Sequence, residues 1–132
     1  MEDRYLFKAK FDDSDRWVKG QLVEVNDAYF IIPNHASKIL AGWFSTSNII
    51  EVKKDTICRY TGREDKNGKL IWENDIVKIN NSKVNTLITF RDFEIICTIP
   101  NEKYYKHRLE YDTEYEVIGN KFDNPELLES EE

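Results

Sequence analysis

The stretch TGREDKNGKLIWENDIVKI, residues 61–79, has the pattern of a β-hairpin that feeds a barrel strand. Asn67-Gly68 is a strong short-range hairpin signal, because a type I′ turn needs positive φ at both of its central residues. In DIVKI, residues 75–79, alternate side chains would face opposite sides, as in a half-buried strand. We expect Trp72, in the arm of the hairpin, to fill the core.

Four carboxylates gather in the same stretch, those of Glu64, Asp65, Glu73 and Asp75. A hairpin that brought them together could hold a metal or provide a paired acid and base. The alternative is a set of solvated turn and edge residues, in which Asn74 or Asp75 bonds to the backbone of the turn. We favour the alternative, because no base, nucleophile or phosphate-binding loop accompanies the carboxylates.

Short β-type runs separated by turn residues continue on both sides of this stretch. They are RYLFKAKF, RWVKGQLVEV and AYFIIP, with a turn at VND, then NIIEV and TICRY, and later KVNTLITF, FEIICTI and TEYEVIGN. Asn124 is placed to cap a last helical turn with Pro125 at its first position. Strands that recur about every ten residues predict a mainly β fold, a barrel or a sandwich, with little helix.

The charge of the chain is unevenly distributed. Its 132 residues suit a single domain over 1–132, with 19 basic and 25 acidic side chains and a net charge of −6. Residues 123–132 hold five of the acids and no base, so the body is nearly neutral and the C-terminus is an acidic tail. This balance disfavours strong non-specific binding to DNA.

The two cysteines, Cys58 and Cys97, form no CxxC motif, which indicates reduced thiols, and we expect Cys58 to be a buried small hydrophobe. His35 and His107 are far apart and lack partners at metal-ligand spacing, so no metal or other cofactor is predicted. The first residues lack the apolar segment of a signal peptide, and no run approaches the ~18 apolar residues of a membrane span. We expect a soluble, cytoplasmic protein.

Three segments of the chain resemble the YopX family, small proteins of bacteriophages and prophages. The family's central motif stands here as YTGREDKNGKLIWENDIV, and its terminal segments stand as YLFKAKFDDSDRWVKGQL and EVIGNKFDNPELL. They lie in register, so the resemblance covers nearly the whole chain as one YopX-like domain. It implies coiled antiparallel sheets with an SH3-like barrel part, and it implies no activity.

The resemblance gives the motif residues a structural role. They are Tyr60, Thr61, Gly62, Asp65, Asn67, Gly68, Asp75, Gly119, Asn120, Asn124 and Pro125. Two positions depart from the family pattern: Arg63 stands where the family usually has Leu, and Asn74 where it has Gly. Asn is the residue that best tolerates positive φ after Gly, so we expect the turn at Asn74 to persist.

Cations and aromatic rings interleave in KYYKHR, residues 103–108. The candidate nucleic-acid contacts are Lys103, Tyr104, Tyr105, Lys106 and Arg108. The alternative is an amphipathic connector whose tyrosines pack and whose cations are solvated. We favour the connector, because the rest of the body offers no net positive field.

An apolar segment, HASKILAGWF, lies between two of the predicted strands. Its large side chains, Ile39, Leu40, Trp43 and Phe44, are too apolar to lie in water. They would either cap the protein's own barrel or meet another subunit. Together with exposed strand edges, which soluble proteins cover, they predict a homo-oligomer.

The sequence therefore favours a non-enzymatic phage or prophage accessory protein, a β module that binds a protein partner or itself. The alternative is a nucleic-acid-binding module that uses residues 103–108. An enzyme comes third, because no catalytic constellation is visible. The partner, phage or host protein, is not identified by any motif.

Overall fold

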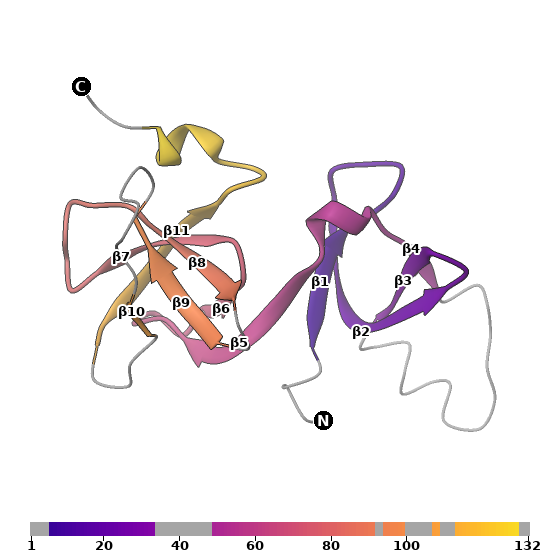
Figure 1. The fold of residues 1–132 in the computed structure, drawn as a ribbon, viewed down its shortest axis with the longest axis horizontal. Helices are drawn as coiled ribbons and strands as arrows, with labels where there is room; N and C mark the ends of the chain where they lie inside the picture. Colours follow the sequence, from indigo (N-terminus) through magenta and orange to yellow (C-terminus); the bar gives the residue numbers. More distant parts are fainter. Residues whose placement is uncertain (1–5, 34–48, 92–93, 100–106, 109–112, 130–132) are drawn as a thin grey trace. The chain divides into compact units, whose positions relative to one another are not determined.

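The protein is mainly β. The structure, a computed structural model, describes residues 6–33, 49–91, 94–99, 107–108 and 113–129. Strands take up 59% of these residues and helix 7%, in two antiparallel sheets, so the predicted fold class is confirmed (Figure 1). Neither sheet closes into a barrel within the described residues, and the SH3-like part stays a prediction. No helix among them is long and apolar enough to cross a membrane.

The chain divides into two compact units, Met1–Tyr60 and Thr61–Glu132. The strand β5 (Cys58–Glu64) begins in the first unit and ends in the second. The prediction of one domain over 1–132 stays a prediction, because compactness does not tell whether the two units unfold together.

A meander of antiparallel strands forms the first unit, in the order β4-β3-β2-β1-β5 (Figure 1). Its elements are β1 (Phe7–Lys10), β2 (Trp17–Val25), β3 (Ala28–Pro33), β4 (Ile50–Glu51), the 3-10 helix η3 (Lys54–Thr56) and the first residues of β5. The predicted turn at VND is confirmed, because Val25 pairs with Ala28 around it. Asn26 and Asp27 both have positive φ there, 50° and 66°, as a type I′ turn requires.

One face of this sheet carries the core of the first unit. Ala9, Val18, Ile31 and Val52 are buried together. Half-buried apolar side chains pack around them, those of Phe11, Leu22, Tyr29, Ile50 and Ile57. The predicted burial of Cys58 is also confirmed, and its thiol donates to the Thr56 carbonyl oxygen at 3.2 Å.

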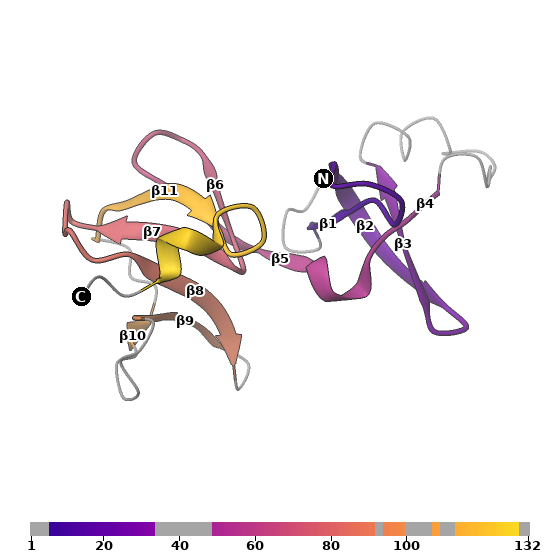
Figure 2. The ribbon, with the colours of Figure 1, turned by 90° about the horizontal axis from the view of Figure 1, so that it is seen from above.

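In the second unit the strand order is β10-β9-β8-β7-β11, and β6 pairs with the end of β5 (Figure 2). The elements are β6 (Leu70–Trp72), β7 (Asp75–Ile79), β8 (Thr86–Arg91), β9 (Glu94–Thr98), β10 (His107–Arg108), β11 (Tyr115–Asn120) and the 3-10 helix η4 (Pro125–Leu128). Its core cluster consists of Ile71, Val77, Ile88, Cys97 and Tyr115.

The prediction that β7 is half-buried is wrong. Its first three residues, Asp75, Ile76 and Val77, are all buried, although alternate residues face opposite sides. The reason is the position of β7 inside the sheet, where it pairs with β11 on one edge and with β8 on the other. An interior strand of this kind can be covered on both faces. The expected burial of Trp72 is confirmed.

The predicted type I′ turn at Asn67-Gly68 is also wrong, although a hairpin does form. Of the two residues only Gly68 has positive φ, +81°. The Gly68 N–H donates to the Asp65 carbonyl oxygen at 3.0 Å, and the Asp65 N–H donates to Lys69 at 2.7 Å. The loop therefore has three residues, with a left-handed glycine last, and a two-residue type I′ loop does not form.

Replacing Gly68 by valine should lower the free energy of unfolding by about 1–2 kcal/mol, because β-branched residues resist positive φ. No atom lies within 4 Å of a Cβ built at Gly68, so this cost comes from the backbone alone. Urea denaturation followed by circular dichroism measures it, with Gly68→Asn as the control. Asparagine adopts positive φ at Asn74, as predicted, and at Asn80 and Asn81, so this variant should lose less. Equal midpoints for wild type and Gly68→Val would contradict the left-handed assignment.

The C-terminal motif folds back on itself. Pro125 begins η4 as predicted, but the predicted side-chain cap by Asn124 is wrong. The Asn124 Oδ1 instead accepts the Asn120 N–H at 3.2 Å, and a Cβ at Gly119 would overlap the Asn124 side chain. The Asn85 amide donates to the Leu127 carbonyl oxygen at 2.9 Å, so the acidic segment 123–132 begins with a folded turn.

Candidate interaction surface

The face of the first sheet opposite its core is the outer face, defined by strand register. Residues with odd numbers in β2 point to this face, because Val18 and Leu22 point to the core. Cross-strand partners share a face, so the register extends it to β1, β3 and β4. The outer face carries Lys8, Lys10, Trp17, Lys19, Gln21, Val23, Val25, Ala28, Phe30, Ile32 and Glu51.

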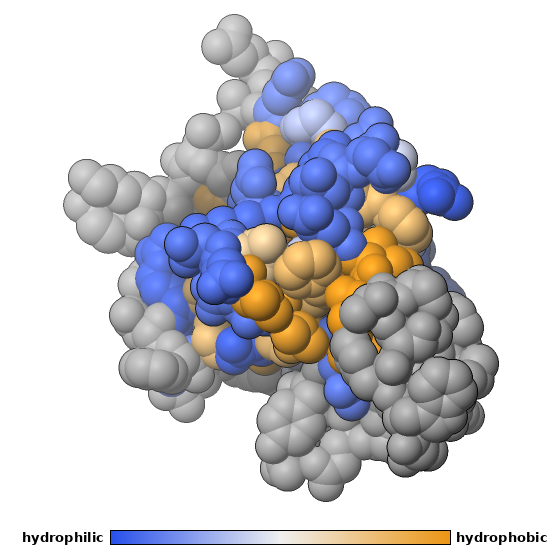
Figure 3. All heavy atoms as spheres, turned by 90° about the vertical axis from the view of Figure 1, so that its right-hand side faces the viewer, coloured by the Kyte–Doolittle hydropathy of each residue, from blue (hydrophilic) through white to orange (hydrophobic). Residues whose placement is uncertain are grey.

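The half of the outer face on the β2–β3 hairpin is apolar. Val23 lies opposite Phe30, Val25 opposite Ala28, and Ile32 opposite Gln21. Val23, Phe30 and Ile32 are half-buried, and Val25 is 51% exposed. Figure 3 shows apolar side chains at the surface, next to hydrophilic ones, on the side that carries β2, β3 and β4 in Figure 1. The hairpin is thus apolar on both faces, and its core face packs into the buried cluster of the first unit.

The other half of the outer face is aromatic and basic. The Lys8 ammonium lies 4.6 Å from the centroid of the Trp17 ring, and the Lys10 ammonium lies 5.4 Å from it. Contacts of this kind stabilise by about 0.5–1 kcal/mol at exposed sites. Lys10 and Trp17 are cross-strand partners, which places the ammonium and the ring on the same side.

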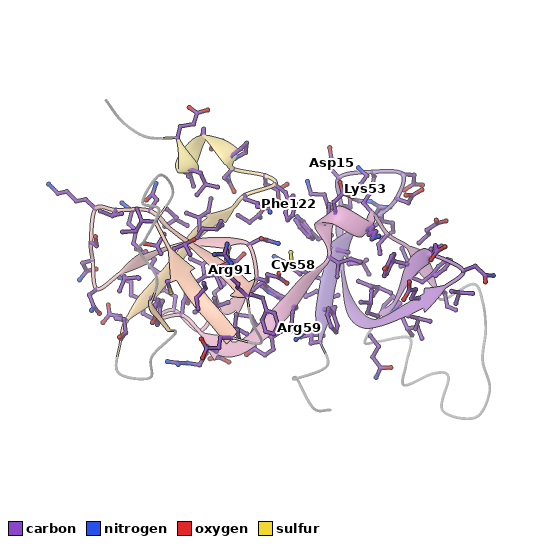
Figure 4. All side chains as sticks on the ribbon, in the orientation of Figure 1. Asp15, Lys53, Cys58, Arg59, Arg91 and Phe122 are labelled. Carbon is purple, nitrogen blue, oxygen red and sulfur yellow. The ribbon has the colours of Figure 1, made fainter. Side chains whose placement is uncertain are left out.

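The carboxylate of Asp15 lies between two cations near the aromatic and basic half of the outer face. Asp15 lies 3.8 Å from the Lys10 Nζ and 3.6 Å from the Lys53 Nζ. Figure 4 shows Asp15 and Lys53 next to each other, one from the loop after β1 and one from the residues before η3. Lys10 and Lys53 are therefore held by a carboxylate within their own unit.

The hairpin of residues 61–79 has its own polar centre at Asp65. The Asp65 Oδ1 accepts the N–H groups of Asn67 and Lys69, both at 2.9 Å, and the Oδ2 accepts that of Val117 at 3.0 Å. Burial raises the pKa of Asp65, but these three donors and the Lys69 charge lower it more, so the pKa lies below its ordinary value. The Lys66 N–H donates to Tyr115, so two adjacent residues tie the hairpin to β11.

Other motif residues in this hairpin also bond to backbone. The Thr61 hydroxyl donates to the Ile71 carbonyl oxygen at 2.7 Å, and the Asp75 carboxylate accepts the Trp72 N–H at 2.8 Å. Asp65 and Asp75 therefore bond to the backbone of turns, as favoured from the sequence. The expectation that they are solvated is wrong, because both residues are buried. Within the described stretches, no three histidine, cysteine, aspartate or glutamate side chains are grouped so that they could hold a metal. The motif builds the hairpin and β11 into one structure.

Most of the predicted contact residues lie outside the described residues. This holds for Ile39, Leu40, Trp43 and Phe44, and for Lys103, Tyr104, Tyr105 and Lys106. Arg108 is described only by its backbone, which lies in β10 and pairs with Ile96 of β9. Both sets stay predictions.

Sequence reasoning missed the outer face of the β2–β3 hairpin. The available signal was the run AYFIIP, in which successive residues are apolar without alternation. A strand apolar at successive positions is covered on both faces, whereas a meander strand with one solvated face alternates. The run therefore pointed to a second covering layer.

Comparison with known proteins supports the resemblance found in the sequence. The family model described as YopX protein matches residues 6–129 of the 132. The matched range includes all the motif residues that the structure describes. No curated protein matches the sequence.

Proposed function

The chain belongs to the YopX family, and from this premise we propose that it is a non-enzymatic accessory protein of a phage or prophage. It works in the bacterial cytoplasm as a β module that binds protein. Its contact surface is the apolar half of the outer face, formed by Val23, Val25, Phe30 and Ile32 of the β2–β3 hairpin.

A single observation carries this proposal, namely that the hairpin is apolar on both faces. The core face buries Ile31 completely and Val18 almost completely. The outer face presents β-branched and aromatic side chains that are only half-buried, next to the exposed Val25. Apolar patches with a polar rim mark protein contact sites, because burying them removes apolar area from water.

Single-stranded nucleic acid remains the alternative, through the residues predicted in 103–108. The described residues add little support to it. Among the described residues, the Trp17 ring already lies beside the ammonium groups of Lys8 and Lys10, which contact it within the first unit. The body is also nearly neutral, which gives a weak attraction for phosphates.

A photo-cross-linking amino acid at position 25, in the full chain produced in lysogenic or infected cells, tests the proposal. Irradiation should yield protein adducts, because Val25 is exposed at the end of the patch. Adding Phe30→Glu should abolish them. The control carries the cross-linker at Glu64, which is exposed on β5 in the second unit. Adducts to nucleic acid alone, or none at position 25, would sink the proposal.

A further inference from the structure

We infer that the apolar half of the outer face binds a second copy of the chain in a twofold symmetric, face-to-face dimer. The inference rests on the proposed function, because it names the protein that the surface binds. It concerns only the first unit, and the residues from which it is argued all lie in described strands.

Charges at the rim of the patch are the first argument. Lys19 lies on β2, and Glu51 lies on β4 beside Phe30, both on the outer face. Phe30 in turn pairs with Val23, four residues beyond Lys19 on β2. The cation and the carboxylate therefore occupy opposite corners of the patch, and both residues are exposed.

Such a surface is complementary to itself. A twofold axis that lies in the interface and bisects the line from Lys19 to Glu51 at a right angle brings Lys19 onto the partner's Glu51. The same rotation brings Glu51 onto the partner's Lys19, so both pairs form at once. Symmetric dimers require this reciprocity, whereas an unrelated partner would need its charges placed independently.

The centre of the patch suits packing of one sheet on another. Val23, Phe30 and Ile32 stand on neighbouring strands, and side chains of this shape interdigitate between sheets about 10 Å apart. The four strands have 4, 9, 6 and 2 residues, which at about 3.4 Å per residue and about 4.8 Å between strands give a face of about 340 Å². Two copies then bury about 700 Å², which is less than the about 1,000 Å² of a stable specific interface, so the dimer should be weak and should depend on concentration.

Sedimentation velocity on the purified full chain, over a range of concentrations, tests the inference. The mass should rise from the 15.7 kDa of one chain toward twice that value. Lys19→Glu alone and Glu51→Lys alone should each weaken the dimer about tenfold, because like charges then meet at both corners. The double variant should return to within about threefold of wild type, since the exchanged pairs attract again. Circular dichroism checks that all variants keep the fold.

Two results would overturn the inference. One is a mass of 15.7 kDa at all concentrations up to hundreds of micromolar. The other is a dimer that ignores the single charge changes or is not restored by the double variant. The proposed function fails separately, because adducts from position 25 to a different protein would still support it when the chain is monomeric. Loss of those adducts together with a monomeric mass would remove both.

Discussion

Replacing Asp65 by alanine should produce one of the two largest losses of stability of any single substitution in the described residues. The carboxylate accepts three backbone N–H groups, those of Asn67, Lys69 and Val117, and the residue is only 7% exposed. Alanine leaves these donors without acceptors. A buried donor without an acceptor costs about 1–3 kcal/mol. The three bonds are partly buried, so we take the lower end for each and expect the free energy of unfolding to fall by about 3 kcal/mol.

Urea denaturation of the full chain measures this loss, with Glu64→Ala as the matched control. Glu64 is the exposed carboxylate next in sequence, so its removal should change the free energy of unfolding by less than about 0.5 kcal/mol. Hydrogen exchange supplies a local readout, because the Val117 amide should lose protection in Asp65→Ala. Equal stability of the two alanine variants would show that the three bonds do not hold the hairpin to β11.

The same carboxylate predicts a dependence on pH. Its pKa is lower in the folded chain than the ordinary 3.8, so the folded state favours the charged form. The stabilisation is therefore present above about pH 4 and is lost as the pH falls through the lowered folded value. Wild type should lose stability over this range more steeply than Asp65→Asn, which has no charge to lose. Parallel curves for the two proteins would contradict the role of the charge.

Local sequence chemistry predicted the hairpin but not its geometry. Asn67-Gly68 marks a reversal, and its neighbours have the alternation of strands. The loop gains a third residue because the Asp65 side chain accepts the N–H groups of Asn67 and Lys69 from within the turn. The bond to Val117 joins residues 52 apart in sequence. No periodicity or spacing reveals such a partner.

Burial on two faces was the second limit of sequence reasoning. The run IIP in β3 and the pair Ile76-Val77 in β7 were both assigned to strands correctly. Strand order decides the rest, because β7 lies between β8 and β11, while β3 lies between β2 and β4. The order of the strands in a sheet depends on contacts between segments that are distant in sequence. The alternation of apolar and polar residues therefore cannot by itself distinguish an interior strand from a half-solvated one. The run AYFIIP indicated a second covered face, and the register then identified which residues of β2 and β3 form the candidate surface.

Replacing Gly20 by alanine should destabilise the first unit by about 3 kcal/mol or more, because overpacking against backbone exceeds the usual 1–3 kcal/mol for crowded side chains. A Cβ at Gly20 would overlap the Ile32 carbonyl oxygen and lie 2.7 Å from its carbon. Pro33 Cα lies 2.9 Å from the same position. These atoms belong to the backbone of β3, which cannot turn away as a flexible side chain could.

Position in the sheet makes this crowding hard to relieve. Gly20 pairs with Phe7 of β1 on one side and with Pro33 of β3 on the other, so shifting β3 would disturb the register that buries Ile31. The matched control is Gly68→Ala, where a Cβ meets nothing within 4 Å and only the positive φ costs about 1 kcal/mol. Urea denaturation should give Gly20→Ala a clearly lower free energy of unfolding than Gly68→Ala. If the two variants were equally stable, β2 and β3 would have to lie farther apart at Gly20 than they do here, and the register of the outer face would have to be redrawn.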